Sequence, residues 1–381
     1  MLWALAGVGA KGIGMMASKA VWAAVAVAAM VAAVAWSSAM GQPASGPGTS
    51  ATAAPAVGAT TRPAGGAASV PASIPASRPA RPVEGGRPRN WSNQPPWAQE
   101  PGGPRHNTFR SELVKQDVGY TIWLPPAYEA RPEGRFPVVY SLHGITGDEV
   151  DGARRFARIL QGAIEAGQCP PTILVMVNGY RDSFYVDSVD KTVPMESIII
   201  TELIPHVDAT YRTVADRKGR GIAGFSMGGY GAMRLGLKYT DVFSSIVSMG
   251  GAFVGEDTGR SRGGAAFGGN MEYFRACDPA NIARANAGKI RAARMEILMA
   301  CGDQDGLMGR NRQMSALLTE LGIVHRFVSV PGVGHDHSAM YNGLGAAAWE
   351  THGRGSGWAP ARSASQPASV PVSAPASAPG R

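Results

Sequence analysis

A serine lies between glycines at residues 224–232, which read GFSMGGYGA and contain the pattern G-x-S-x-G around Ser226. In that pattern a serine on a sharp strand-to-helix turn can act as a nucleophile. The pattern alone is weak evidence here, because the chain holds 50 glycines and repeats it as GRSRG around Ser261. The secondary structure predicted on either side of each serine must therefore show whether its motif marks a nucleophile or is a chance match in a glycine-rich chain.

The segments around Ser226 differ from those around Ser261. The run at 221–224 predicts a strand leading into Ser226, and 229–239 predicts a helix leaving it. Such a turn raises the serine hydroxyl above the sheet and places the N–H of Met227 at a helix N-terminus, where it can stabilise an oxyanion. Ser261 has neither a predicted strand before it nor a helix after it. We therefore predict that Ser226 is the nucleophile.

A nucleophilic serine needs a histidine as its general base. His325 begins a predicted strand, and His352 lies near the end of the predicted domain. His335 lies in the glycine-rich segment VPGVGHDH, directly after a predicted strand, and this loop can bring it over Ser226. We predict His335 as the base, with His337, two residues further along, as the alternative.

The histidine in turn needs a carboxylate to orient it, and in α/β-hydrolases the chain order is serine, acid, histidine. The segment EILMACGDQD supplies Asp303 and Asp305 directly after another predicted strand. Spacing leaves both acids open, since either could instead cap the turn that follows.

The elements that would position these residues alternate between strands and helices. This alternation predicts the α/β class, a mostly parallel sheet with helices on both faces. In open α/β sheets, functional residues gather at the carboxyl ends of strands, where the candidate serine, acids and histidine all fall. The predicted strands are 108–114, 120–124, 137–144, 172–177, 221–224, 242–249, 297–301 and 326–330. The predicted helices are 153–166, 195–211 with a kink at Pro205, 229–239, 311–321 and 339–350.

The chain ends differ in composition from the predicted domain at 106–355. Residues 1–40 contain an uncharged apolar run followed by small residues, which predicts a signal peptide or an N-terminal membrane anchor. Residues 41–105 and 356–381 are rich in Pro, Ala and Ser and predict a disordered linker and tail. These features favour a secreted, periplasmic or envelope-tethered protein.

Charge and cysteine content exclude some functions. The formal net charge is +8, but residues 106–355 carry 26 basic and 26 acidic residues, so the excess lies in the ends. We therefore expect no nucleic-acid partner, because such binding needs a basic face on the folded part. Cys169, Cys277 and Cys301 form no C-x-x-C pair and no zinc-like spacing, and their disulfide state stays open. We expect no metal and no cofactor.

Several segments together resemble the esterase D-like family of α/β-hydrolases, which includes S-formylglutathione hydrolases, feruloyl and acetyl-xylan esterases, and mycolyltransferases. In order, these segments are SLHG, SFYVDS, ESIIITELIPHVDATYRT, GFSMGGYGAMRLGLKY, CGDQDGLMGRN and PGVGH. The resemblance covers about residues 115 to 340, and the long run at 196–239 makes it specific.

The resemblance also implies roles for individual residues. It places the acid at Asp305, with Asn311 six positions later, and the histidine at His335. It implies that the second oxyanion N–H comes from Ile145, and that His143 shapes this loop. One departure concerns the pattern G-H-x-W of relatives, since this chain has His337 at the aromatic position.

Together the residues and the resemblance predict a serine carboxylesterase that acts through an acyl-enzyme. The expected substrate is a small-molecule or glycan-linked ester, such as an acyl or feruloyl group on polysaccharide. The alternatives are an envelope acyltransferase with the same three residues and a non-catalytic surface binding domain.

Overall fold

The computed structural model describes residues 90–97, 100–255 and 264–358. The predicted signal or anchor at 1–40, the second serine motif around Ser261 and most of both predicted tails lie outside these residues. Among the described residues, no helix is long and apolar enough to cross a membrane. The proposed organisation of the two chain ends therefore stays a prediction.

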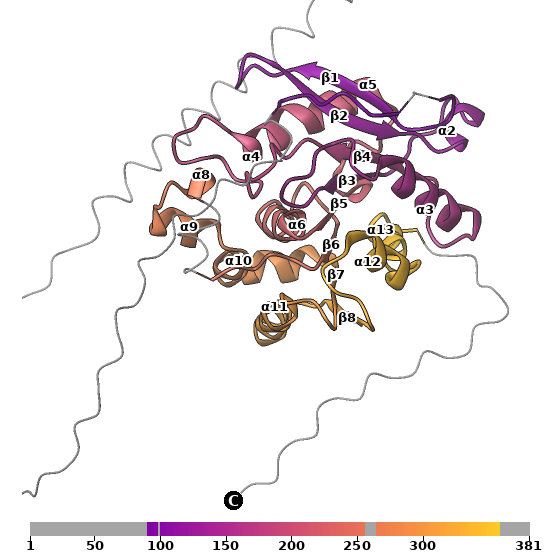
Figure 1. Ribbon diagram of the computed structural model, residues 1–381. Helices are drawn as coiled ribbons and strands as arrows, with labels where there is room; N and C mark the ends of the chain where they lie inside the picture. Colours follow the sequence, from indigo (N-terminus) through magenta and orange to yellow (C-terminus); the bar gives the residue numbers. More distant parts are fainter. Residues whose placement is uncertain (1–89, 98–99, 256–263, 359–381) are drawn as a thin grey trace, which may run out of the picture. The chain divides into compact units, whose positions relative to one another are not determined.

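Eight strands form one sheet in the order β1-β2-β4-β3-β5-β6-β7-β8 (Figure 1). The pairings of β1 with β2 and of β2 with β4 are antiparallel, and all the others are parallel. The strands are β1 Arg105–Arg110, β2 Asp117–Trp123, β3 Val138–Leu142, β4 Ile173–Val177, β5 Arg220–Phe225, β6 Ser245–Met249, β7 Glu296–Gly302 and β8 Arg326–Val330.

The register brings the carboxyl ends of the central strands together. Leu142, the last residue of β3, lies opposite Gly224 of β5, and Met249, the last residue of β6, lies between Phe225 and Ala300. Because these strands are parallel, the loops that follow them leave the same edge of the sheet. Ile145 and Ser226 follow β3 and β5 at this edge, and Asp305 and His335 follow the neighbouring parallel strands β7 and β8.

Helices cover both faces of the sheet (Figure 1). On one face lie α6 Met227–Lys238 and α10 Pro279–Ala293, and on the other lie α3 Ala153–Glu165, α12 His337–Leu344 and α13 Ala347–Gly355. The remaining α-helices are α2 Ala127–Ala130, α4 Met195–Ser197, α5 Ile204–Thr210, α8 Gly264–Phe267, α9 Met271–Cys277 and α11 Met308–Glu320.

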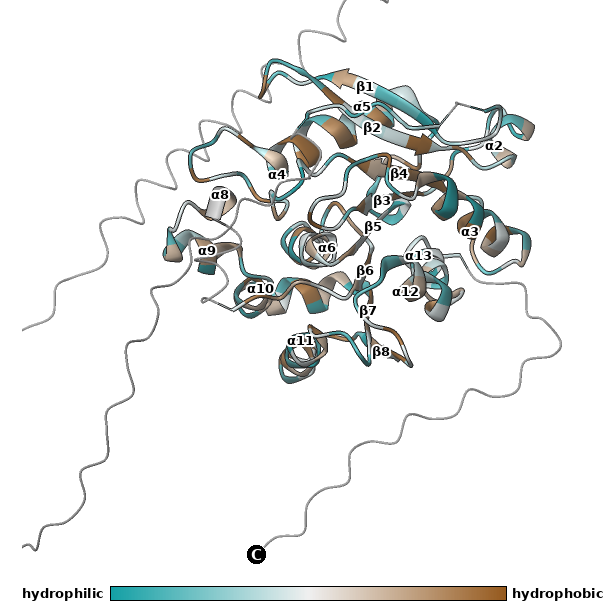
Figure 2. Cartoon of the chain, in the orientation of Figure 1, coloured by the Kyte–Doolittle hydropathy of each residue, from teal (hydrophilic) through white to brown (hydrophobic). Residues whose placement is uncertain are grey.

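The two faces of the sheet carry separate apolar cores. Ile222 and Ile246 belong to the core under α6 and α10, whereas their neighbours Ala223 and Val247 belong to the core under α3, α12 and α13. Successive strand side chains point to opposite faces, so a strand buried on both sides reads as a continuous apolar run. In Figure 2, hydrophilic residues, in teal, lie on outer helices such as α3 and α11.

The predicted α/β class and mostly parallel sheet are confirmed, but some helices differ from the prediction. The predicted helix at 339–350 divides at Gly345, whose φ of 53° ends α12. α9 and α10 were not predicted, because their small and charged residues give little apolar periodicity. The available signal was Asp278, which accepts a hydrogen bond from the N–H of Ala280, followed by Pro279 at the first helical position.

The predicted kink at Pro205 takes the form of a π-helical turn. This turn spans Ile198–Leu203 and joins α4 to α5, with Pro205 in the first turn of α5. Proline has no N–H to donate, and its ring crowds the carbonyl one turn before it. A wider turn ahead of the proline lets the helix continue.

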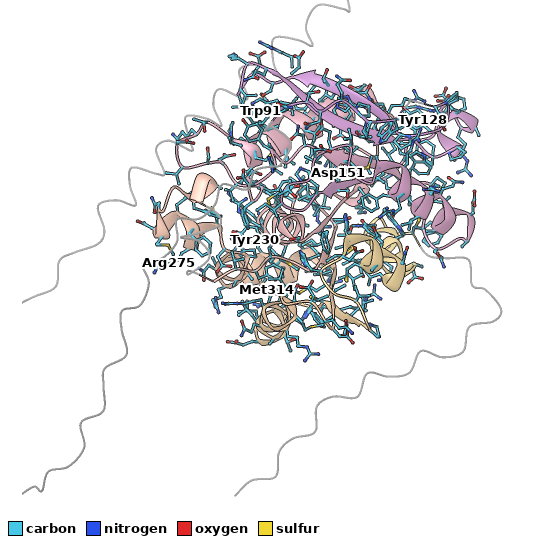
Figure 3. The ribbon with its side chains drawn as sticks, viewed as in Figure 1. Trp91, Tyr128, Asp151, Tyr230, Arg275 and Met314 are labelled. Atoms are coloured by element: carbon cyan, nitrogen blue, oxygen red, sulfur yellow. The ribbon has the colours of Figure 1, made fainter. Side chains whose placement is uncertain are left out.

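The described residues before β1 form a segment, 90–97, that we call the N-terminal arm. Its Trp91, labelled in Figure 3, is buried. The indole stacks on Tyr180 at 4.2 Å between ring centroids. Trp97 lies partly buried beside Arg154 of α3, 5.6 Å from the guanidinium carbon. The sequence predicts a linker up to residue 105, but the arm contacts the domain, because its two tryptophans offer apolar area that the surrounding Pro/Ala-rich sequence lacks.

A buried ion pair joins α6 to α4. Arg234, which is 2% exposed, donates a hydrogen bond to Glu196 and a second one to the carbonyl oxygen of Tyr185. Glu196 also accepts hydrogen bonds from Lys238 and Tyr239. Every charge in this group therefore has a partner, as burial of charge requires.

Removal of Glu196 should destabilise the fold. In Glu196→Ala, the guanidinium of Arg234 stays buried without its counter-ion, so we expect a loss of about 3–5 kcal/mol in unfolding free energy. Lys238→Ala is the matched control, because its more exposed ammonium also bonds Glu196 and should cost under about 1 kcal/mol. Urea unfolding measures both values, and equal losses would contradict this account.

His352 should make the fold sensitive to acid. Burial lowers the pKa of His352 to about 3, from an ordinary value near 6.5 in the unfolded chain. Between these values only the unfolded chain takes up the proton, so stability falls as pH falls, by about 2 kcal/mol from pH 7 to pH 5 for this residue. His352→Gln should reduce the pH dependence of urea unfolding by that amount. Parallel pH profiles for the two proteins would disprove it.

Candidate active site

Ser226 lies on a tight turn between β5 and α6. Its backbone has φ 57° and ψ −116°, a conformation that non-glycine residues rarely adopt. A Cβ on Gly224 would overlap the carbonyl oxygen of Gly228, and a Cβ on Gly228 would overlap that of Leu142. The two glycines of G-x-S-x-G are thus required by the close approach of β3, β5 and α6, as expected for a nucleophile elbow.

The structure brings Ser226, His335 and Asp305 into one hydrogen-bonded chain. Nε2 of His335 lies 2.9 Å from Oγ of Ser226, and Nδ1 lies 2.7 Å from Oδ2 of Asp305. A carboxylate can only accept, so Nδ1–H donates to Asp305 and the unprotonated Nε2 faces the serine hydroxyl. This is the arrangement in which a histidine can take a proton from serine.

The geometry also separates the two candidate acids. The side chain of Asp305 is 1% exposed, and its Oδ1 accepts a hydrogen bond from the N–H of Leu307 at 2.8 Å. Asp303 is exposed, and its Oδ1 instead accepts from the N–H of Gly332, 2.8 Å away in the loop that leads to His335. Asp303 therefore stabilises the loop by a hydrogen bond to its backbone, whereas Asp305 contacts the histidine ring.

Asn311 and Gly250 shape the loop that lies against Asp305. Asn311 is fully buried and bonds both the N–H and the carbonyl oxygen of Gly251, at 3.1 and 2.9 Å. Gly250 has φ 50°, and a Cβ there would come within 3.1 Å of Oδ2 of Asp305. The resemblance pointed to Asn311, but no sequence signal singled out Gly250 among the 50 glycines.

The loop after β3, residues 143–152, lies against the serine, and we call it the oxyanion loop. A Cβ on Gly144 would be 3.5 Å from Cβ of Ser226, so Ile145 follows at the edge of the site with 43% exposure. Met227 is buried as the first residue of α6, a position whose N–H has no partner within the helix. The two predicted oxyanion residues thus flank Ser226 on separate segments.

His143 stabilises the oxyanion loop through hydrogen bonds of its buried ring. Its Nε2 accepts a hydrogen bond from the N–H of Gly179 at 2.8 Å, so its proton is on Nδ1, which donates to the carbonyl oxygen of Gly144. Burial lowers the pKa of His143, which keeps the ring neutral. The hydroxyl of Tyr185 donates to the carbonyl oxygen of His143 at 2.9 Å. These contacts assign His143 a positioning role, as the resemblance implied.

His337, the alternative base, lies in a different environment from His335. Its ring stacks on Phe225 at 4.6 Å and contacts Phe156 at 4.6 Å and Tyr341 at 5.2 Å. Burial lowers the pKa of His337 to about 3, so the ring is neutral at physiological pH. Its ring lies in an aromatic cluster at the position where the pattern G-H-x-W has an aromatic residue.

A cavity of about 310 Å³ adjoins the oxyanion loop. Its wall includes Ile145, Arg155, Phe156, Phe225 and His337. The wall therefore combines aromatic rings with charged groups, since Asp148 and Asp151 line it together with Arg155. In the described part of the chain, no group of three or more His, Cys, Asp or Glu residues could hold a metal ion.

The fold and this hydrogen-bonded chain define the class of α/β-hydrolases with a serine nucleophile elbow. A family model described as "Putative esterase" matches residues 111–352, and the chain belongs to this family. The match begins in the loop after β1 and ends in α13, so it includes every candidate site residue.

Relatives in this family carry esterase names. An esterase of Mycobacterium tuberculosis (strain H37Rv) is 35% identical over 147 residues, which is 38% of this chain and 31% of the relative. The endo-1,4-beta-xylanase/feruloyl esterase of Xylanibacter ruminicola is 32% identical over 161 residues, 39% of this chain and 22% of that protein. The alignments thus span less than a third of these curated relatives.

Solved structures share the fold over most of their own length. A ferulic acid esterase has a TM-score of 0.58 at 23% identity and covers 66% of this chain and 98% of its own. The S-formylglutathione hydrolase from Agrobacterium tumefaciens has a TM-score of 0.56 at 18% identity, with 68% and 97% covered. These similarities establish the α/β-hydrolase fold.

Proposed function

We propose that the protein is an exported serine carboxylesterase with Ser226, His335 and Asp305 as its catalytic triad. The observation that carries this proposal is the chain of two hydrogen bonds, 2.9 and 2.7 Å long, that joins these residues at the carboxyl end of the sheet. Membership of an esterase family supports the reaction class.

In the first half of the reaction, Oγ of Ser226 attacks the ester carbonyl carbon while Nε2 of His335 takes its proton. The carbonyl oxygen becomes an oxyanion, which accepts hydrogen bonds from the N–H groups of Met227 and Ile145. Asp305 stabilises the imidazolium that forms. When the intermediate collapses, the ester C–O bond breaks and His335 gives its proton to the departing alkoxide, which leaves as an alcohol.

In the second half, water replaces the alcohol. His335 takes one proton from the water molecule, and the hydroxide attacks the acyl carbon of the Ser226 ester. Collapse of this second intermediate returns the proton to Oγ of Ser226 and releases the carboxylic acid. The enzyme then has its starting protonation state, with no cofactor consumed.

The proposed substrate is an extracellular ester, such as an acetyl or feruloyl group on a polysaccharide. The names of the relatives support this class, since they include a feruloyl esterase and an acetyl esterase of Caldicellulosiruptor saccharolyticus. The apolar N-terminal run in 1–40 supports export, by secretion or as an envelope-tethered form.

A panel of acetyl, butyryl and feruloyl esters tests the proposal on the full chain. We expect hydrolysis of at least one ester and covalent labelling of Ser226 by a fluorophosphonate, located by peptide mass spectrometry. Labelling of another residue, or no turnover of any ester together with no labelling, would contradict the proposed function.

A further inference from the structure

The N-terminal arm contacts two loops of the active site. The first is the oxyanion loop, and the second is the segment 178–186 between β4 and α4, which we call the tyrosine loop. These two loops are joined by hydrogen bonds from the N–H of Gly179 to His143 and from the N–H of Thr146 to the carbonyl oxygen of Arg181, at 2.8 and 3.0 Å. A shift of the tyrosine loop would therefore displace the residues on either side of Ile145.

The arm binds the oxyanion loop through a buried carboxylate. Glu149 has no exposed surface, and its two oxygens accept hydrogen bonds from the backbone N–H and the side-chain amide of Asn93, at 2.7 and 2.8 Å. Nε2 of His106 lies 3.1 Å from the same carboxylate. The carboxylate packs against Gly119 of β2, where a Cβ would overlap it, so this position requires glycine. Among the described residues, Asn93 thus supplies two of the three hydrogen-bond contacts to a charge that burial would otherwise penalise.

The arm binds the tyrosine loop through a ring and a backbone contact. The indole of Trp91 stacks on Tyr180 with an interplanar angle of 27°, and the amide of Asn178 donates to the carbonyl oxygen of Asn90 at 3.0 Å. Tyr180 and Arg181 have φ of 46° and 64°, a left-handed backbone that costs free energy in non-glycine residues. Surrounding contacts must hold this conformation, and Trp91 covers it directly.

We propose that Trp91 and Asn93 are positioning residues for the esterase reaction. They hold the tyrosine and oxyanion loops in the conformation that aims the N–H of Ile145 at the oxyanion. This inference rests on the proposed function for its catalytic readout. The arm lies before β1 and before the region that the family model matches. Our proposal therefore adds residues of this earlier segment to those that support the esterase reaction.

The test compares Trp91→Ala and Asn93→Ala with the matched control Trp97→Ala in the full chain. Trp97 belongs to the same arm but contacts α3, so its removal should leave kcat within about twofold. Because the oxyanion forms only after substrate has bound, the two test variants should lose kcat by about tenfold or more, with KM within about twofold. Trp91→Phe keeps an aromatic ring on Tyr180 and should restore most of kcat.

Hydrogen exchange gives a readout that does not depend on turnover. The amides of Thr146 and Gly179 should exchange faster in Trp91→Ala than in the wild-type chain and Trp97→Ala. Unchanged kcat in a folded Trp91→Ala protein would overturn the inference while leaving the esterase proposal intact. If the wild-type chain hydrolyses no ester, the esterase proposal fails, and unchanged exchange at these amides would then overturn the inference by itself.

Discussion

Ser226→Ala is expected to lower kcat for p-nitrophenyl acetate by at least about 10⁴-fold. The variant has no Oγ to form the acyl-enzyme, so the proton acceptor at His335, 2.9 Å from that atom, has nothing to activate. Fluorophosphonate labelling should disappear with the activity. The fold should remain, because alanine can replace serine at this turn without adding volume between Gly224 and Gly228.

Ser261→Ala is the matched control, since it removes the serine of the chain's second G-x-S-x-G match. We expect its kcat and labelling to equal those of the wild-type chain. Retention of turnover in Ser226→Ala, or its loss in Ser261→Ala, would mean that the nucleophile has been assigned to the wrong serine.

Asp305→Asn should lower kcat by about 10³- to 10⁴-fold. An amide at this position can donate to Nδ1 of His335 and so favour the tautomer that has its proton on Nε2, where it cannot accept from Ser226. The amide also lacks the charge that stabilises the imidazolium formed during attack. Steady-state kinetics on p-nitrophenyl acetate measures the loss, which should appear mainly in kcat.

Asp303→Asn makes the same chemical change two residues earlier and serves as the control. Its amide oxygen can still accept the hydrogen bond from Gly332, and the side chain is exposed, so we expect kcat within about threefold of wild type. If Asp303→Asn were the more damaging substitution, the acid of the proposed triad would be wrong.

Much of the sheet could be predicted because its strands are buried on both faces. Continuous apolar runs such as 173–177 have few other interpretations, and glycines around Ser226 mark the tight turn. The residues after these strands were then predicted to meet at one edge, and Ser226 and His335 do lie within hydrogen-bond distance. Local sequence was sufficient to predict the positions of Ser226 and His335, because each lies in the loop that follows a predicted strand.

Other features depend on contacts between distant segments, which spacing cannot reveal. Asp303 and Asp305 follow the same strand, and only the path of the β8–α12 loop decides which of them faces His335. Asn93 and Glu149 are 56 residues apart, and neither lies in a recognisable pattern. The arm was therefore predicted to be linker. The composition of 41–105 is dominated by Pro, Ala and Ser, and it does not reveal which residues the few large side chains of the arm contact.

The arm has a consequence for limited proteolysis. A protease that cut the Pro/Ala-rich sequence before residue 90 would leave a fragment that keeps Trp91 and Asn93, and we expect this fragment to keep its full turnover rate. A cut between Trp97 and Arg105 would separate the arm from β1 and leave it held by noncovalent contacts, such as those at Tyr180 and Glu149. We therefore expect two fragments cut on either side of the arm to differ in activity, so the position of the cut would determine the turnover rate of the fragment.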